Sequence, residues 1–498
     1  MSEQKSAASS GKVSRLVLTW FAVVFLFLAW MAWLVLSAVS VRDGGAARSN
    51  RAGEMGDGPV FVLDGLQKKD TAAVPSPPFA DSAEYVLAGA GLQGFYQTSE
   101  PDEVWTFSYP TPELAVQLVR RGPPAPRILT EGVKVFWSLD ARTGPSKGSP
   151  ARQGEMEAVQ DSHFQVAIPV SAVRTDGVLD PYPVVTLRAE DEKTGKVLAE
   201  SAAVLAVSPG FSCVHCHENG GTAILEVHDR HVYTNLRQRQ AKGEVIVCRS
   251  CHGGAAAGRE NPDGEKTDPQ DGNGKKVAQG LSLSAAMHGW HAVYLPDRGA
   301  DACMTCHVSL GRVGSNREAP PRPLFARDFH LERGLDCVRC HGFLEDHALA
   351  LLKAEQESGK NQAGKAIASI VPRAAPLDKI TARQAWVQEP DCASCHDFSQ
   401  KPDPRTASAF GSWTDKKDGA SALFSNRKDD MVMVRCITCH GAPHAAYQAE
   451  NPLAPGLDNI PPIQYQRLAA PFGTSGNCAM CHGEPKDFFA HHPLVESK

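Results

Sequence analysis

The chain has 498 residues, which is long enough for more than one domain. Its formal net charge of −5 gives no basic excess, so the composition excludes a protein that binds nucleic acid through a broad positive surface. Aromatic residues make up only 7% of the sequence, whereas 43 Gly and 35 Pro residues favour a structure rich in loops.

The N-terminal 41 residues end in an uncharged, strongly apolar run of 26 residues, from 16 to 41. A membrane-spanning helix needs about 20 such residues, so we predict a single transmembrane anchor within residues 1–41. Lys5, Lys12 and Arg15 precede the run and favour a cytoplasmic N-terminus in the inner membrane, with the remaining chain in the periplasm or further out. A cleaved secretory signal is the alternative, although its apolar core usually spans about 7–15 residues.

The next 167 residues contain a predicted linker and a predicted β-sandwich. Residues 42–80 are rich in Gly, Ala, Ser and Pro and predict a flexible tether. Between 81 and 208 the pattern becomes that of short strands separated by turns, which favours an immunoglobulin-like sandwich without a disulfide. The loop 191–195 is expected to join the last two strands as a hairpin. The predicted strands are 103–109, 114–120, 133–139, 164–170, 183–190 and 197–207.

The predicted sandwich offers no catalytic constellation. Its only histidine is His163, which we expect to be an isolated surface residue. We therefore predict that this region is a spacer or a docking module.

Seven copies of Cys-x-x-Cys-His lie between residues 213 and 482, and they use all fourteen cysteines of the chain. This motif predicts covalent attachment of c-type haem, because two thiols separated by two residues reach the two vinyl groups of one porphyrin. The histidine that follows is then the proximal ligand of the iron. The seven motifs are Cys213/Cys216/His217, Cys248/Cys251/His252, Cys303/Cys306/His307, Cys337/Cys340/His341, Cys392/Cys395/His396, Cys436/Cys439/His440 and Cys478/Cys481/His482.

Zinc sites and structural disulfides are the alternatives to haem. Zinc would pair the Cys-x-x-Cys units around shared metals and would not need a histidine after each one. A disulfide framework does not need that histidine either. The complete set of seven pentapeptides therefore favours seven haems c as the cofactors.

Residues 209–498 form the predicted heptahaem domain. They provide 290 residues for seven haems, which is too little chain for a separate helical core around each one. We expect a haem-packed domain of a multihaem cytochrome c, in which short helices and loops surround haems that pack on one another.

Ten further histidines in this domain could complete the coordination of seven irons. His288 and His291 are three residues apart, so on a helix they would project from one side and could serve two neighbouring haems. His228 and His231 have the same spacing. Met287, Met431 and Met433 are alternative axial ligands. The candidate distal histidines are His215, His228, His231, His288, His291, His330, His347, His444, His491 and His492.

Several segments resemble a known family. They are the strand 197–207 leading into the first motif, the pair His228-Asp229, the stretch 285–291, the pair Phe329-His330 and the stretch 440–444. From about residue 182 onward the chain is similar to exported multihaem c-type cytochromes of metal- and sulfur-respiring bacteria. The resemblance implies haems with two histidine ligands in a chain that conducts electrons. It favours as distal ligands His228, His288, His291, His330, His444 and one of His491 and His492.

These observations predict an electron-transfer protein of an extracytoplasmic respiratory chain rather than an enzyme. Its expected partners are redox proteins, namely a membrane-bound donor and periplasmic or cell-surface acceptor cytochromes. The alternative is a multihaem reductase or oxidase of a small nitrogen or sulfur compound, which needs one iron with an open face. All seven motifs are of ordinary length and end in His, so none marks a catalytic haem. Direct oxidation of quinol is disfavoured because 172 positions separate Val41 from Cys213.

Overall fold

The computed structural model describes residues 77–482, with gaps at 81, 93–95, 98–104, 107–111, 123–125, 144–151, 160–161, 209–216, 218–219, 249–250, 253–279, 297, 308–309, 312–321, 333, 386–388, 391, 393–423, 426–429, 432–433 and 475–476. The chain divides into two compact units, residues 1–56 with 332–334, and residues 57–331 with 335–498. The second unit holds the described strands and helices, apart from Glu332 at the end of α6 (Phe329–Glu332).

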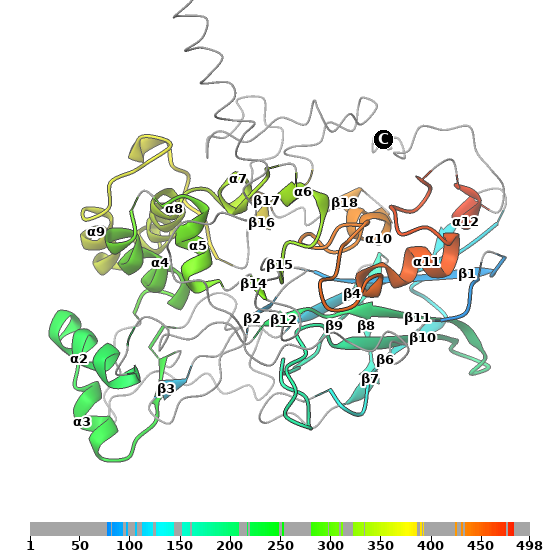
Figure 1. Cartoon of the computed structure of the whole chain (residues 1–498), viewed down its shortest axis with the longest axis horizontal. Helices are drawn as coiled ribbons and strands as arrows, with labels where there is room; N and C mark the ends of the chain where they lie inside the picture. Colours follow the sequence, from blue (N-terminus) through cyan, green and yellow to red (C-terminus); the bar gives the residue numbers. More distant parts are fainter. Residues whose placement is uncertain are drawn as a thin grey trace, which may run out of the picture. The chain divides into compact units, whose positions relative to one another are not determined.

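Two antiparallel sheets pack face to face (Figure 1). The first sheet has the order β1-β4-β9-β8, with β5 paired to β4. The second sheet has the order β11-β10-β6-β7. Their strands are β1 (Tyr85–Gly91), β4 (Glu113–Arg120), β5 (Arg127–Ile128), β6 (Val133–Leu139), β7 (Gln153–Glu155), β8 (Glu157–Val159), β9 (His163–Ala167), β10 (Val184–Asp191) and β11 (Val197–Val204).

The core of the sandwich lies between the two sheets. In β6 every second residue is buried, as expected for a strand with one face toward the core, and Val135 and Trp137 point into it. Leu87 of β1 and Leu187 of β10 meet these side chains from the two sheets. The hairpin between β10 and β11 closes through Asp191, whose amide donates to the carbonyl of Lys196 at 2.9 Å.

β1 differs from β6 because both of its faces are buried. Its outward-facing Val86 packs against Tyr465 of α11 (Ile460–Gln466). The amide of Leu87 donates to the hydroxyl of Tyr465 at 3.0 Å. Farther along the strand, Ala90 packs against Ile437 of α10 (Cys436–His440). The C-terminal part of the chain therefore covers the outer face of the first sheet (Figure 1).

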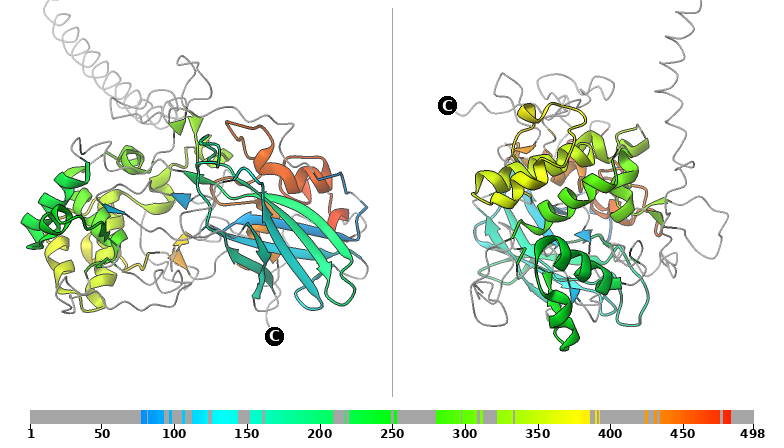
Figure 2. Two further views of the ribbon diagram at one scale, coloured as in Figure 1. Left: turned by 90° about the horizontal axis from the view of Figure 1, so that it is seen from below. Right: turned by 90° about the vertical axis from the view of Figure 1, so that its left-hand side faces the viewer.

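A second apolar core is built from helices. It lies among α4 (Leu283–Tyr294), α8 (Leu344–Glu357) and α9 (Asn361–Ile367), which pack side by side as the green to yellow helices of Figure 2. Gly289 faces α8 so closely that an added Cβ would lie 3.1 Å from Cδ1 of Leu352. A glycine at this point therefore lets the two helices approach. The apolar side chains of Ala285, Ala348 and Leu349 pack between the helices.

The remaining elements are short, apart from the 13-residue helix α2 (Gly220–Val232). In the described part of the chain, two-residue strands form antiparallel pairs, and also two parallel pairs that join segments far apart in the sequence. Short helices carry four of the Cys-x-x-Cys-His motifs. The strands are β2 (Tyr96–Gln97) with β12 (Val207–Ser208), β3 (Trp105–Thr106) with β13 (Ile246–Val247), β14 (Leu310–Gly311) with β15 (Arg322–Pro323), β16 (Glu389–Pro390) with β17 (Phe424–Ser425) and β18 (Asp430–Met431) with β19 (Val434–Arg435). The helices are α2 (Gly220–Val232), α3 (Leu236–Ala241), α5 (Ala300–Cys306), α7 (Cys337–His341), η4 (Leu377–Lys379), η6 (Leu457–Asn459) and α12 (Ala479–His482).

The fold class predicted from the sequence, which began with a membrane-spanning helix, is wrong for the described part of the chain. None of its helices is long and apolar enough to cross a membrane. The longest, α8, has 14 residues, whereas a span needs about 20. What the structure has instead is a pair of antiparallel sheets with short helices packed on them and beside them. The predicted anchor (1–41) and nearly all of the predicted linker (42–80) lie outside the described residues.

Candidate haem-binding sites

The third, fourth, sixth and seventh motifs lie on short helices, namely α5, α7, α10 and α12. In a helical turn the two thiols and the histidine hold positions i, i+3 and i+4, which lie on one side, so the three side chains point the same way. The amide of His307 donates to the carbonyl of Cys303 at 2.8 Å, and that of His482 donates to the carbonyl of Cys478 at 2.9 Å.

The second motif departs from this pattern at Cys251, although the sequence presents all seven motifs as alike. Cys251 lies in a turn rather than in a helix. Its amide donates to the carbonyl of Cys248 at 3.2 Å, and its own carbonyl accepts from the amide of Gly280 at 2.9 Å. The amide of His252 donates to the carbonyl of Cys248 at 3.1 Å, so the histidine still lies one turn after the first cysteine of the motif. The segment before α4, which contains Gly280, thus contacts this motif. The thioether bond of Cys251 stays a prediction, like those of the other cysteines.

One test of whether such residues fit haem is the spacing of histidine pairs. A bond from a metal to a histidine nitrogen is about 2 Å long, so two imidazoles on opposite sides of one iron have ring centres roughly 6 Å apart. Four pairs of predicted proximal and distal histidines in the structure have this separation. His341 belongs to two of them, because its ring centroid lies 6.3 Å from that of His444 and 6.4 Å from that of His347. The His444 ring is nearly parallel to the His341 ring, whereas the His347 ring is inclined to it by 63°.

The first pair is His341 of α7 and His444, which follows α10. Their ring centroids lie 6.3 Å apart and their planes differ by 7°. The amide of Arg327 donates to the carbonyl of His444 at 2.9 Å, and the ring of Phe325 meets the His444 ring edge-on at 5.8 Å. Both contacts fix the loop that presents His444.

The second pair is His288 of α4 and His307 at the end of α5, with centroids 6.1 Å apart and planes 10° apart. The Nδ1 atom of His288 lies 2.8 Å from the carbonyl oxygen of Ser284, one turn back along α4. This bond holds the Nδ1 proton and places the lone pair on Nε2, an arrangement typical of histidine ligands.

The third pair is His228 of α2 and His252, with centroids 6.0 Å apart and planes nearly perpendicular, at 87°. The Nδ1 atom of His252 lies 2.7 Å from the carbonyl oxygen of Leu281. The Nδ1 atom of His228 lies 2.8 Å from Oγ1 of Thr234. In each ring Nδ1 makes the hydrogen bond, and Nε2 is the nitrogen that would face an iron.

His291 points from the same helix as His288 but toward a different partner. Burial lowers the pKa of His217, and the nearby His291 lowers it further. The Nδ1 atom of His291 lies 2.8 Å from the carbonyl oxygen of Met287. The two histidines of α4 are therefore placed next to the histidines of two different motifs, the first and the third.

Burial keeps the central rings neutral, which a metal ligand requires. It lowers the pKa of His288 to about 3, with His307 as the next cause. It lowers the pKa of His341 to about 3 and that of His307 to about 4, in both cases with His444 as the next contributor. These imidazoles are therefore uncharged at neutral pH.

His330 has a carboxylate behind it. Its Nδ1 atom lies 2.8 Å from Oδ2 of Asp328, a side chain that is 3% exposed. This hydrogen bond is the main reason that the pKa of His330 is raised. A carboxylate that orients the far nitrogen of an imidazole is a common support for a metal ligand.

Two other predicted candidates lie in different surroundings. His231 is exposed, and its ring meets that of Trp290 at 5.0 Å. His347 lies 4.5 Å from the His288 ring and contacts Arg383. The predicted site residues outside the described part are Cys213, His215, Cys216, Cys395, His396, His491 and His492.

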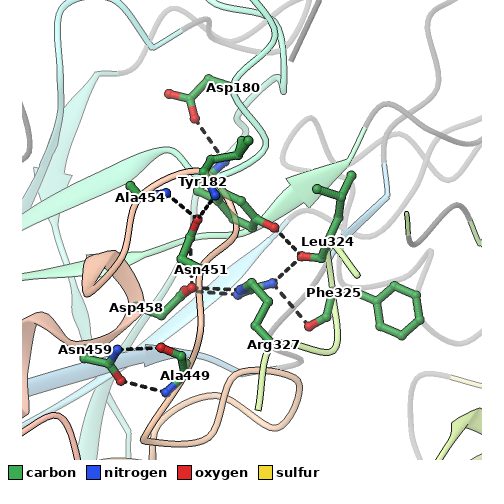
Figure 3. A network of polar contacts seen from close by, with 11 residues as sticks. Asp180, Tyr182, Leu324, Phe325, Arg327, Ala449, Asn451, Ala454, Asp458 and Asn459 are labelled. Atoms are coloured by element: carbon green, nitrogen blue, oxygen red, sulfur yellow. Dashed lines mark hydrogen bonds and ion pairs between the residues drawn. The ribbon is translucent and has the colours of Figure 1, made fainter. Parts of the chain in front are cut away.

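A buried ion pair that the sequence did not single out supports two of the candidate ligands. Arg327 donates through Nε and Nη2 to the two carboxylate oxygens of Asp458, at 2.8 and 3.0 Å. The side chains are 1% and 4% exposed. Figure 3 shows Arg327 between Asp458 and the backbone carbonyl of Leu324, which also accepts from the hydroxyl of Tyr182. The pair therefore ties the sandwich to the segment that leads to His330 and to the loop that carries His444.

The prediction for His163 is wrong. The residue is 4% exposed, because the segment that leads into the sixth motif covers it. Arg435 donates from Nη1 to Nε2 of His163 at 3.3 Å. The amide of the same arginine donates to Oε1 of the buried Gln117 at 3.1 Å. His163 and Gln117 thus fix the sixth motif to the first sheet.

Neither alternative to haem is found in the described part of the chain. No disulfide joins its cysteines, and no cluster of three or more His, Cys, Asp or Glu side chains is placed there to bind a metal ion. A haem iron takes only two protein ligands, and the paired imidazoles provide two. The cysteines without a disulfide are Cys248, Cys251, Cys303, Cys306, Cys337, Cys340, Cys392, Cys436, Cys439, Cys478 and Cys481.

Comparison with known proteins adds no relative. No protein-family model matches the chain, and no curated protein matches it significantly.

Proposed function

We propose that the chain is an electron-transfer protein that carries seven covalently attached c-type haems. The observation that carries the proposal is the spacing of His341 and His444, His288 and His307, and His228 and His252 at 6.3, 6.1 and 6.0 Å. Each pair joins the histidine of a motif to a histidine from elsewhere in the chain. When bound, the haems would supply one-electron redox chemistry.

Two histidines on one iron favour electron transfer over catalysis. They leave no axial position for a substrate, and no ligand has to be gained or lost when the oxidation state changes. The chain contributes the neutral rings, their buried surroundings and the hydrogen bonds to Nδ1 that hold each ring in place. A multihaem reductase would instead need one imidazole to lack an opposing partner.

Contacts between neighbouring motifs support a continuous path. The third and fourth motifs are adjacent, because α5 contacts α7 and the side chains of Cys303 and Cys337 lie close together. Burial raises the pKa of the Cys439 thiol in the sixth motif, and Cys481 of the seventh motif lies close enough to raise that pKa further. Electron tunnelling weakens steeply with distance, so this adjacency favours conduction from one site to the next.

The proposal includes location and partners. Bacterial c-type haem is attached outside the cytoplasm, so the motif-bearing part belongs in the periplasm or farther out. A redox protein of the inner membrane would donate electrons, and a periplasmic or cell-surface cytochrome would accept them. Membrane attachment of this chain stays a prediction from its sequence.

The proposal is tested by counting haems and their spin states in the purified full chain. The pyridine haemochromogen assay and the intact mass should give seven haems per chain, and the oxidised protein should show low-spin spectra. Fewer than seven haems, or a protein that is purified free of haem from a host competent in cytochrome c maturation, would refute it. A complete set of haems with one of the seven high-spin would favour the reductase.

A further inference from the structure

His347 and Arg383 lie together between two of the paired histidine sites. The His347 ring, on α8, has its centroid 4.5 Å from that of His288 and 6.4 Å from that of His341. His288 belongs to the pair at the third motif and His341 to the pair at the fourth. A side chain in this position is close to axial ligands of both proposed haems.

Arg383 contacts both nitrogens of the His347 ring. Its Nη2 atom lies 2.7 Å from Nδ1 and 3.1 Å from Nε2 of that ring. The Nδ1 atom of His347 also lies 3.2 Å from the carbonyl oxygen of His341, which can only accept, so Nδ1 carries the ring proton. The single lone pair of the neutral ring is then on Nε2, which accepts from Nη2 of Arg383 at 3.1 Å. The nitrogen that would bind iron is therefore already engaged by Arg383.

The arginine is also fixed and buried. It is 7% exposed, and its backbone amide donates to the carbonyl of Ala350 in α8 at 2.9 Å. A guanidinium does not lose its proton in a protein, so the positive charge is permanent. Arg383 contacts His347, whose ring centroid lies 4.5 Å from that of His288 and 6.4 Å from that of His341, so the charge lies near both neighbouring sites.

We infer that His347 is not an axial ligand and that the Arg383–His347 pair raises the reduction potentials of the haems held at the third and fourth motifs. This inference rests on the proposed function. Ferric haem carries one more positive charge than ferrous haem. A fixed positive charge nearby therefore disfavours the ferric form, and the low dielectric of the interior strengthens the effect. The pair makes these two positions better electron acceptors than they would be without it.

The test is a spectroelectrochemical titration of the full chain with its haems. Arg383→Met removes the charge while keeping most of the volume, and Arg383→Lys keeps the charge. At a fixed applied potential, the Met variant should shift the ferric-to-ferrous ratio of two of the seven haems toward ferric by about tenfold, which is 59 mV for a one-electron couple. The Lys variant should leave that ratio within about threefold of the wild type. No shift in the Met variant, or equal shifts in both, would overturn the inference.

A second variant tests the role of His347 and serves if Arg383→Met does not fold. His347→Gln should keep all haems low-spin and unreactive toward carbon monoxide, because no axial ligand is lost. Carbon monoxide binding at one haem in this variant would show that His347 is an axial ligand, and the inference would fail. A wild-type protein without seven low-spin haems would instead refute the proposed function, so the two failures are distinguishable.

Discussion

The imidazole rings of His341 and His444 lie 7° from parallel, with their centroids 6.3 Å apart. His341 ends the fourth motif, whereas His444 follows the sixth, so two distant stretches of chain supply the two faces of one proposed site. The spacing is the one that two imidazoles need to bind the same iron from opposite sides.

Replacing His444 should open one haem without detaching it. His444→Ala removes a distal ligand, while the thioether bonds and His341 stay in place. The reduced variant should bind carbon monoxide at one haem in seven, measured from the Soret difference spectrum. His231→Ala is the matched control, because His231 is exposed and packs on Trp290. An unreactive His444 variant would mean that another residue completes this site.

The pairing of His288 with His307 predicts that the two variants affect the same iron. His288→Ala and His307→Ala should each retain seven covalent haems, because the thiols are untouched, and each should bind one equivalent of carbon monoxide. The double variant should lose one low-spin haem and no more, measured by electron paramagnetic resonance of the oxidised protein. Loss of two low-spin haems in the double variant would show that the two histidines bind different irons.

The ion pair between Arg327 and Asp458 should be a large contributor to stability. Arg327→Met leaves the buried Asp458 carboxylate without its cation, which costs about 3–5 kcal/mol of unfolding free energy. Tyr182→Phe removes only the hydrogen bond to the carbonyl of Leu324 and should cost about 0.5–1.5 kcal/mol. Denaturant titration of the haem-loaded variants measures both values. Equal losses would contradict this ranking.

Gly441 should tolerate no side chain. Its φ of +82° is a conformation that L-residues rarely adopt, and an added Cβ would lie 2.6 Å from Cε1 of Tyr447. Gly441→Ala should therefore destabilise the protein by about 1–3 kcal/mol and shift the loop that carries His444. Gly473→Ala is the control for strain alone, since Gly473 has the same φ and no atom within 4 Å of an added Cβ. Thermal unfolding compares the two, and a smaller effect at Gly441 would argue against this packing.

The strands of the sandwich were predictable where one face alone is buried. The strand at 133–139 alternates apolar and other residues, and β6 has the predicted bounds. β1 (Tyr85–Gly91) was missed, because Ala and Gly are weak strand formers and both of its faces are covered. No alternation marks a strand whose outer face is buried by a segment from the far end of the chain.

The candidate site was predictable in its residue types but not in its pairings. The spacing of His288 and His291 predicted a shared helix face, yet their partners lie in other elements and depend on the fold. His163 looked isolated because Arg435, which contacts it, lies 272 residues later in the sequence. The turn at Cys251 could not be predicted, because its motif has the same pattern as the other six. The contact of Cys251 with Gly280, 29 residues later, is visible only in the structure. Arg383 carries no local motif, so only the structure brings it to the histidines.

The most direct test of the central claim is the spectrum of the wild-type protein, reduced with dithionite, before and after addition of carbon monoxide. Carbon monoxide binds ferrous haem only where an axial position is open or easily vacated. Seven haems that each have two histidine ligands predict an unchanged Soret band. A change worth one haem in seven would contradict the account and would reveal an open site, at which nitrite, hydroxylamine and tetrathionate would be the first substrates to assay.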